Sequence, residues 1–256
     1  MTVLNKRNLR SLQRKKESKK LSFAIVLCVL CIATTLGIFM LVKHVMKVTD
    51  MSYSGLQHLK GEDLSVLIRT GKGEELFGSS GSDIYRRLKK SPWVKDAAIR
   101  RDLSGRLSVK VQEAVPGSIL KLYESDYLVS EDGVVLEKIS DSAIFLPVIK
   151  DIDPAKSRDA FKTAVDLVRT LHAKGAISYK GLIEVAGQRP EEITLTFDNI
   201  RIRIGAGDFE KKLERLKFVR DEIEKRNMNV DYIDLRFSNK VIVKPVNGDA
   251  VVSRQG

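Results

Sequence analysis

The sequence predicts an α+β protein that is anchored by a single N-terminal membrane helix. An uncharged run of 22 residues near the N-terminus predicts the anchor, because soluble helices rarely stay free of charge for that length. Short segments in which apolar and polar residues alternate recur along the rest of the chain, and two long amphipathic helices lie among them. With 43% hydrophobic and 30% charged residues, the composition suits a folded chain and excludes collagen-like or disordered ones.

Most of the positive charge belongs to a basic tail, residues 1–20. The tail holds eight Lys or Arg residues and one acid, whereas the other 236 residues hold 37 basic and 32 acidic ones. The rest of the chain is therefore close to balanced, which disfavours a domain that coats nucleic acid. We expect the tail to be cytoplasmic and to act as a topology signal, and a role in partner binding stays open.

Residues 21–42 form the predicted transmembrane helix. At 1.5 Å per residue a helix of this length spans about 33 Å, enough for the roughly 30 Å hydrocarbon layer. A cleaved signal peptide is the rival interpretation, but its apolar stretch is usually about 7–15 residues and ends in a small-x-small site that is missing here. Because only Lys43 and Lys47 follow the helix closely, the Lys/Arg bias places residues 43–256 outside the cytoplasm.

Residues 45–114 predict a small unit with the order β-α-α-β-β. A strand is expected over 48–56, a short helix opens at Gly61, and a second helix covers 83–90 with Ser82 or Asp83 as its cap. Strands over 94–100 and 106–113 then form a hairpin around residues 103–105. Trp93 is interpreted as a packing residue, with an exposed docking aromatic as the alternative.

Residues 115–246 predict an antiparallel β domain with two packed helices. The first helix starts just after Pro154 and runs to about Lys174, and the second runs from Asp208 to Arg226; apolar residues recur at helical spacing in both. Strands are expected over 119–123, 127–130, 134–138, 182–186, 192–197, 200–204, 232–237 and 241–246. The last ten residues, 247–256, have little to bury and are expected to form a flexible tail.

No pattern in the sequence indicates catalysis, a cofactor or a metal site. The glycine pair 205 and 207 stands at a strand-to-helix turn, but Glu210 replaces the third glycine of a dinucleotide loop, and Asp208 is interpreted as the helix cap. The three histidines lack metal-ligand spacing, and Cys28 and Cys31 lie inside the membrane helix. We therefore expect no enzyme and no cofactor; an extracytoplasmic enzyme or carbohydrate-binding module stays open as an alternative.

Four segments together resemble the FtsQ/DivIB family of bacterial cell-division proteins. Residues 84–101, with Pro92-Trp93-Val94 at their centre, look like the family's helix-to-strand corner, and residues 107–116 are similar to the strand after it. Residues 207–213 and 232–244, which include Asp234-Leu235-Arg236, resemble its closing helix and final strand pair. The turn at 102–105 departs from the aromatic-Pro turn of many members, and the linker 74–81 keeps only Leu76-Phe77 of the common wording.

The resemblance implies both an architecture and a function. It implies a POTRA domain over 45–114 and a β domain over 115–246, behind a single-pass anchor in the bacterial cytoplasmic membrane. It also implies a non-enzymatic divisome scaffold at the septum, which links early and late division proteins and binds FtsB- and FtsL-like coiled-coil partners through the C-terminal part of the β domain. A POTRA-bearing assembly or secretion factor outside division is the alternative.

The segment 240–244 is the expected docking edge. Its side chains alternate, with Val241 and Val243 on one face and Ile242 on the other, and a strand that ends a meander can offer free backbone groups to a partner strand. Pro245 has no N–H, so pairing should fade there. Phe237 and Tyr232 are the expected aromatic anchors, because buried aromatic side chains commonly dominate interface energies. The alternative is that both side chains fill the domain core. The expected partner-binding residues are Tyr232, Phe237, Ser238, Lys240, Val241, Ile242, Val243 and Lys244.

Overall fold

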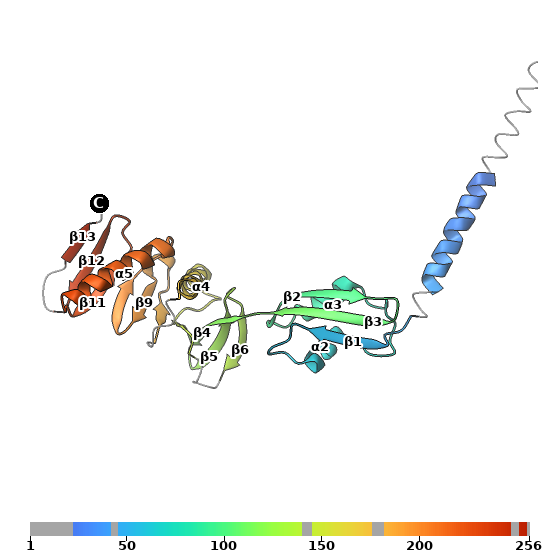
Figure 1. Cartoon of the computed structure of the whole chain (residues 1–256), viewed down its shortest axis with the longest axis horizontal. Coiled ribbons are helices and arrows are strands. Elements are labelled where there is room, and N and C mark those ends of the chain that lie inside the picture. Colours follow the sequence, from blue (N-terminus) through green and yellow to red (C-terminus); the bar gives the residue numbers. More distant parts are fainter. Residues whose placement is uncertain (1–22, 42–45, 140–144, 176–181, 247–250, 255–256) are drawn as a thin grey trace, which may run out of the picture. The chain divides into compact units, whose positions relative to one another are not determined.

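The computed structural model describes residues 23–41, 46–139, 145–175, 182–246 and 251–254 (Figure 1). The chain divides into two compact units. The first comprises the residues up to Lys90 together with Asp96–Gln112, and the second comprises Ser91–Lys95 and the residues from Glu113 onward.

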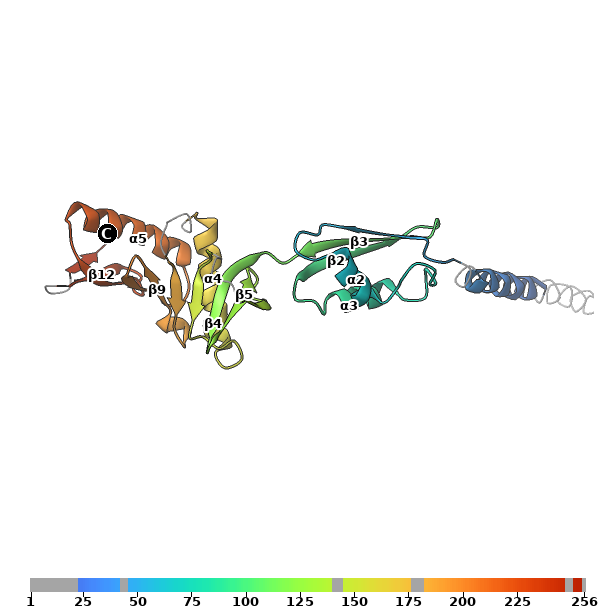
Figure 2. The same ribbon diagram turned by 90° about the horizontal axis from the view of Figure 1, so that it is seen from below.

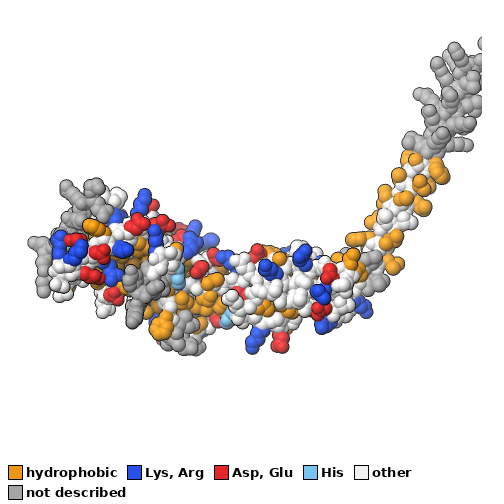
Figure 3. Space-filling model, viewed as in Figure 1, with side chains coloured by type: hydrophobic (Ala, Val, Ile, Leu, Met, Phe, Trp, Pro, Cys, Tyr) orange, Lys and Arg blue, Asp and Glu red, His pale blue; other side chains and the backbone are white. Residues whose placement is uncertain are grey.

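The helix Phe23–Leu41 fits the predicted membrane anchor in length and composition. It has 19 residues, its mean hydropathy reaches 2.7, and no other helix among the described residues is long and apolar enough to cross a membrane. Its apolar side chains are exposed along its length, as the hydrophobic surface in Figure 3 shows. Both free cysteines lie on it, and the outermost residues of the predicted span, 21, 22 and 42, lie outside the described ranges.

The first unit confirms the predicted β-α-α-β-β order. Its three-stranded sheet has the order β1-β3-β2, with β1 parallel to β3, and Figure 2 shows α2 and α3 together beside this sheet. Leu64, Ile68, Ile84 and Leu88 of the two helices are fully buried, as the helical spacing predicts. The elements are β1 (Asp50–Ser54), α2 (Gly61–Ile68), α3 (Gly81–Leu88), β2 (Val94–Arg101) and β3 (Arg106–Glu113).

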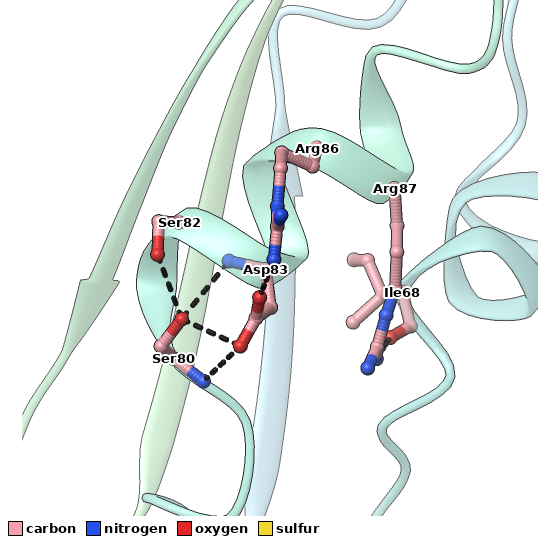
Figure 4. Close-up of polar contacts among 6 residues, drawn as sticks. All are labelled: Ile68, Ser80, Ser82, Asp83, Arg86 and Arg87. Carbon is pink, nitrogen blue, oxygen red and sulfur yellow. Dashed lines mark hydrogen bonds and ion pairs between the residues drawn. The ribbon is translucent and has the colours of Figure 1, made fainter.

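A capping box starts helix α3, and its cap is Ser80 rather than the predicted Ser82 or Asp83. The Asp83 amide donates to Ser80 Oγ at 3.0 Å, and Ser80 Oγ donates to Asp83 Oδ2 at 2.7 Å (Figure 4). The Ser80 hydroxyl, helped by Arg86, lowers the pKa of the Asp83 carboxyl to about 2. Arg87 Nη1 donates to the Ile68 carbonyl at 2.7 Å, so the second helix also holds the end of the first.

The second unit is built on one sheet with the order β13-β12-β11-β10-β9-β8-β7-β4-β5-β6. Figure 2 shows α4 and α5 on the same side of this sheet, and their apolar faces bury the core between themselves and the strands. The elements are β4 (Pro116–Leu122), β5 (Ser125–Ser130), β6 (Val135–Ile139), β7 (Val148–Lys150), α4 (Arg158–Ala173), β8 (Glu184–Ala186), the 3₁₀ helix η2 (Pro190–Glu192), β9 (Thr194–Phe197), β10 (Ile200–Arg203), α5 (Phe209–Lys225), β11 (Val230–Asp234), β12 (Lys240–Pro245) and β13 (Val251–Arg254).

The α+β class is confirmed, but the sheet is mixed rather than antiparallel throughout. The ladders β4–β7, β7–β8 and β10–β11 are parallel. Helix α4 connects β7 to β8, and α5 connects β10 to β11. Each of these two pairs is parallel because a helical crossover brings the chain back in the same direction.

Trp93 is buried, at 8% exposure, which confirms the packing role.

Candidate functional site

The predicted free edge at residues 240–244 is wrong, because the chain's own C-terminal strand occupies it. Strand β13 pairs antiparallel with β12, with Lys240 opposite Arg254 and Val243 opposite Val251. On its other side β12 pairs with β11, so it is an interior strand (Figure 1). The expected flexible tail is therefore wrong for residues 251–254; residues 247–250 and 255–256 lie outside the described ranges.

Strand β12 presents its side chains as the alternation predicts. Val241 and Val243 are buried at 1% and 6% exposure, and Ile242 is half-buried on the opposite face. Pairing does not fade at the proline, however. Pro245 stands opposite Val230, and the Val246 amide donates to the Asn229 carbonyl at 2.9 Å, so the ladder with β11 runs past it.

The two predicted anchors do not fill the core. Phe237 follows β11, is 39% exposed and lies under the Lys240 ammonium, which is 4.6 Å from the ring centroid. Tyr232 is half-buried, with the Arg203 guanidinium 4.4 Å and the Lys244 ammonium 5.8 Å from its ring centroid. Each aromatic ring thus carries cations on its face and stays within reach of a partner.

Helix α5 holds the turn that carries Phe237 and Ser238. Arg215 Nη1 donates to the Phe237 carbonyl at 2.8 Å and to the Ser238 carbonyl at 3.1 Å. These carbonyls lie in the turn between β11 and β12, outside the paired residues of the two strands, and the guanidinium satisfies them. Sequence reasoning missed this positioning residue.

The buried carboxylate of Asp234, the last residue of β11, fixes Arg236 two residues further along the chain. Asp234 is 3% exposed, and it accepts hydrogen bonds from Arg236 Nη2 at 2.6 Å and from the Arg236 amide at 3.0 Å. Burial alone would raise the pKa of Asp234, but the hydrogen bonds from the Arg236 side chain and backbone outweigh it and lower the pKa. The guanidinium of Arg236 is thereby held in one orientation.

A lysine closes the turn that sequence reasoning compared with a phosphate loop. Lys212 is 7% exposed, and its Nζ donates to the carbonyls of Ile204 at 2.8 Å and Ala206 at 2.6 Å. Burial, and then the neighbouring Arg215, lower the pKa of this lysine. Asp208 is the N-cap residue of α5, as predicted, but its side chain makes no capping hydrogen bond. The sequence could have predicted this burial, because Lys212 lies three residues after Phe209 and so falls on the apolar face of the helix.

A cationic hollow of about 710 Å³ lies beside this turn, between α5 and the end of β11. Its lining includes four cations, the carboxylates of Asp208 and Glu214, and the ring of Phe218, which is 56% exposed. The cations are Lys211, Lys212, Arg215 and Arg236. Cations therefore outnumber carboxylates around the hollow, and this excess favours acidic over basic side chains of another protein.

Nothing in the described part of the chain points to metal chemistry. No group of three or more His, Cys, Asp or Glu side chains there could hold a metal ion. His172 on α4 hydrogen-bonds through Nε2 to the Gly117 carbonyl at 2.8 Å, which is a structural contact within the β domain. His44 lies outside the described residues.

Two family models match this chain, one on each side of residue 115. Residues 46–114 match the POTRA domain of the FtsQ type, and residues 121–236 match the C-terminal domain described as cell division protein FtsQ/DivIB. The second match ends before Phe237, so seven of the eight expected partner-binding residues lie beyond it, and only Tyr232 lies within it.

Curated relatives are similar over most of their length. The cell division protein FtsQ of Geotalea daltonii is 27% identical over 209 residues, which cover 78% of this chain and 76% of the relative. FtsQ of Geobacter sp. strain M21 is 26% identical, with 78% and 77% covered. FtsQ of Syntrophotalea carbinolica is 24% identical over 232 residues, with 87% and 81% covered.

Proposed function

Because the chain belongs to the FtsQ/DivIB family of bacterial cell-division proteins, we propose that it is a non-enzymatic, membrane-anchored scaffold of the divisome. It links early and late division proteins at the septum and docks FtsB- and FtsL-like coiled-coil partners at the C-terminal margin of its sheet. The observation that carries this proposal is the group of accessible aromatic and cationic side chains at that margin, around Tyr232 and Phe237.

The proposed topology follows from the charge asymmetry around the helix Phe23–Leu41. Eight Lys or Arg residues precede the uncharged run, and only Lys43 and Lys47 follow it closely, so the N-terminus is cytoplasmic and both folded units lie outside. In this arrangement the anchor confines the docking surface to the outer side of the cytoplasmic membrane, where a partner with an extracytoplasmic coiled coil can meet it.

Charge and shape at the sheet margin favour an acidic, partly apolar partner segment. Lys240 and Lys244 lie on β12, and the hollow beside α5 adds four cations against two carboxylates next to the exposed Phe218. Rim charges of this kind steer encounter and select partners, whereas buried aromatic anchors supply most of the binding free energy. Phe237 and Tyr232 are the anchors in this proposal.

The test is co-purification of the full chain, with its membrane helix intact, together with the FtsB- and FtsL-like proteins of the same cell. Proline at Ile242 is a poor probe, since β12 is an interior strand and the substitution would disrupt two ladders. The double substitution Lys240→Glu and Lys244→Glu keeps the backbone and should weaken recovery of the partners at least tenfold. The matched control is Lys121→Glu on β4, an exposed cation in the same sheet.

Unchanged recovery in the double variant would refute docking at this margin. A fluorescent fusion of the full chain gives the second readout: enrichment at the septum supports a division scaffold, and uniform distribution in the envelope supports a POTRA-bearing assembly or secretion factor.

A further inference from the structure

We propose that β13 occupies the place of a partner strand, so that pairing of β13 with β12 and binding of a partner strand to β12 exclude each other. This inference rests on the proposed function, since it concerns how the same docking margin is controlled. The partner strand would enter by exchange with the chain's own C-terminal segment.

The sheet topology supplies the first argument. Strand β13 has one neighbour, β12, whereas each strand from β12 to β5 has two. Its ladder consists of four residue pairs, from Lys240–Arg254 to Val243–Val251. Detaching β13 therefore costs one short ladder and leaves the connections of the other strands intact. It would return β12 to the free edge that a partner strand needs.

The position of the aromatic and cationic residues supplies the second argument. Phe237, Lys240 and Lys244 lie on β12 or on the turn before it, and a strand paired directly with β12 would lie about 4.8 Å from it. A strand added beyond β13 would lie about twice as far away, with β13 in between. Direct pairing with β12, which requires β13 to leave, is the arrangement that brings a partner's backbone beside these residues.

The connection between the two strands makes the competition intramolecular. Only residues 246–250 separate β12 from β13, so the displaced strand stays at a high effective concentration. The apparent affinity for a partner is the intrinsic affinity multiplied by the fraction of molecules in which β13 is open. If β13 is open in about 1–10% of molecules, its removal should strengthen partner binding about 10- to 100-fold.

The first experiment measures the affinity of the membrane-reconstituted chain for the FtsB- and FtsL-like proteins of the same cell. One variant ends at Val246 and lacks β13; the matched control lacks only Gln255 and Gly256, which follow β13. Exchange predicts at least tenfold tighter binding for the first variant and unchanged binding for the control. Equal or weaker binding without β13 would overturn the inference.

The second experiment locks β13 in place with a disulfide. Ile242 and Val252 are directly opposite in the ladder, and such antiparallel pairs have Cα atoms about 4.5 or 5.5 Å apart, within the range of a disulfide. The variant carries Ile242→Cys and Val252→Cys, with Cys28→Ser and Cys31→Ser to remove the native thiols. Its oxidised form should bind the partners at least tenfold more weakly than its reduced form.

The two proposals fail in different ways. Equal binding by the oxidised and reduced forms would show that the partner does not need the place of β13, and it would sink the exchange while leaving the scaffold function intact. If neither the wild type nor the chain ending at Val246 binds the partners, both proposals are refuted. Hydrogen exchange adds a direct readout, since amides 251–254 should lose protection when the partner binds and would gain it in a strand-addition complex.

Discussion

Replacing Asp234 by Asn should destabilise the C-terminal end of the sheet by about 2 kcal/mol, because net contributions of hydrogen bonds to charged groups run at about 1.5–3 kcal/mol. The carboxylate accepts from the side chain of Arg236 through Nε and Nη2, and it also accepts from the Arg236 amide. Asparagine keeps the shape but loses the charge, and its NH₂ group would face the guanidinium donors.

The burial of the two partners sets the size of this effect. The side chain of Asp234 is 4% exposed, so little water can replace a lost hydrogen bond, whereas the side chain of Arg236 is 41% exposed and can be hydrated again. The variant therefore does not leave an uncompensated buried cation, whose cost would be about 3–5 kcal/mol. A value near 2 kcal/mol follows.

The control is Asp231→Asn, the same change on the same strand. Asp231 pairs with Lys244 at 3.7 Å, with side chains 50% and 47% exposed, and an exposed pair of this kind is worth about 0–1 kcal/mol. Hydrogen exchange of the β11 amides measures the local opening free energy, which avoids combining the two compact units in one unfolding curve.

The pH dependence gives the variant a signature of its own. The pKa of Asp234 is lowered below its ordinary value of 3.8, so between the two values the unfolded chain binds more protons than the folded one. The stabilisation is fully present above about pH 4 and is lost as the pH falls through the folded pKa. The opening free energies of the wild type and Asp234→Asn should therefore converge in acid. Equal losses of stability in Asp234→Asn and Asp231→Asn would refute this account, and so would a difference between the wild type and Asp234→Asn that does not change with pH.

Two further predictions concern the first unit. Ser80→Ala removes the cap of α3 and should lower the free energy of unfolding by about 1 kcal/mol, whereas the control Ser82→Ala should lower it by only about a few tenths of that. In an NMR titration the pKa of Asp83 should rise from about 2 toward 3.8 in Ser80→Ala and stay unchanged in Ser82→Ala. Gly105→Ala places a Cβ 2.7 Å from the Lys47 carbonyl oxygen at a φ of +88° and should cost at least about 1 kcal/mol in thermal unfolding, while Gly81→Ala in α3 meets open space and should gain about 0.5 kcal/mol; a loss of similar size in both would contradict the steric argument.

The sequence was sufficient for elements whose own pattern is long enough to read. Ile84 and Leu88 lie one helical turn apart and are both buried, and Leu107, Val109 and Val111 alternate on one buried face of β3. The alternation of Val241, Ile242 and Val243 was likewise correct. These features depend on neighbours within a few residues, which a single sequence shows directly.

Features that depend on residues far apart in the sequence could not be predicted from it. Strand β7 has three residues, Val148–Lys150, too few to show a period, and its two parallel neighbours come from β4 and β8. Lys212 was not among the residues singled out in α5, yet it is 7% exposed and its Nζ reaches two carbonyls of the preceding turn. Long cationic side chains can do this, since their stems are apolar and only their ends need polar partners.

The misassigned docking edge has the same origin and a physical reason of its own. Val251–Arg254 contain too few residues to stand out as a strand, yet pairing them with β12 satisfies backbone groups that would otherwise face solvent or another chain. Lys240 and Lys244 discourage self-association of such an edge only through charge repulsion, and salt screens this repulsion beyond about 8–10 Å. A covalently attached strand protects the same edge at any ionic strength, and it can be removed by whichever partner strand pairs better. A short exchangeable strand therefore protects the edge against self-association in the free protein and still leaves it available to a partner strand, which a permanently open edge does not do.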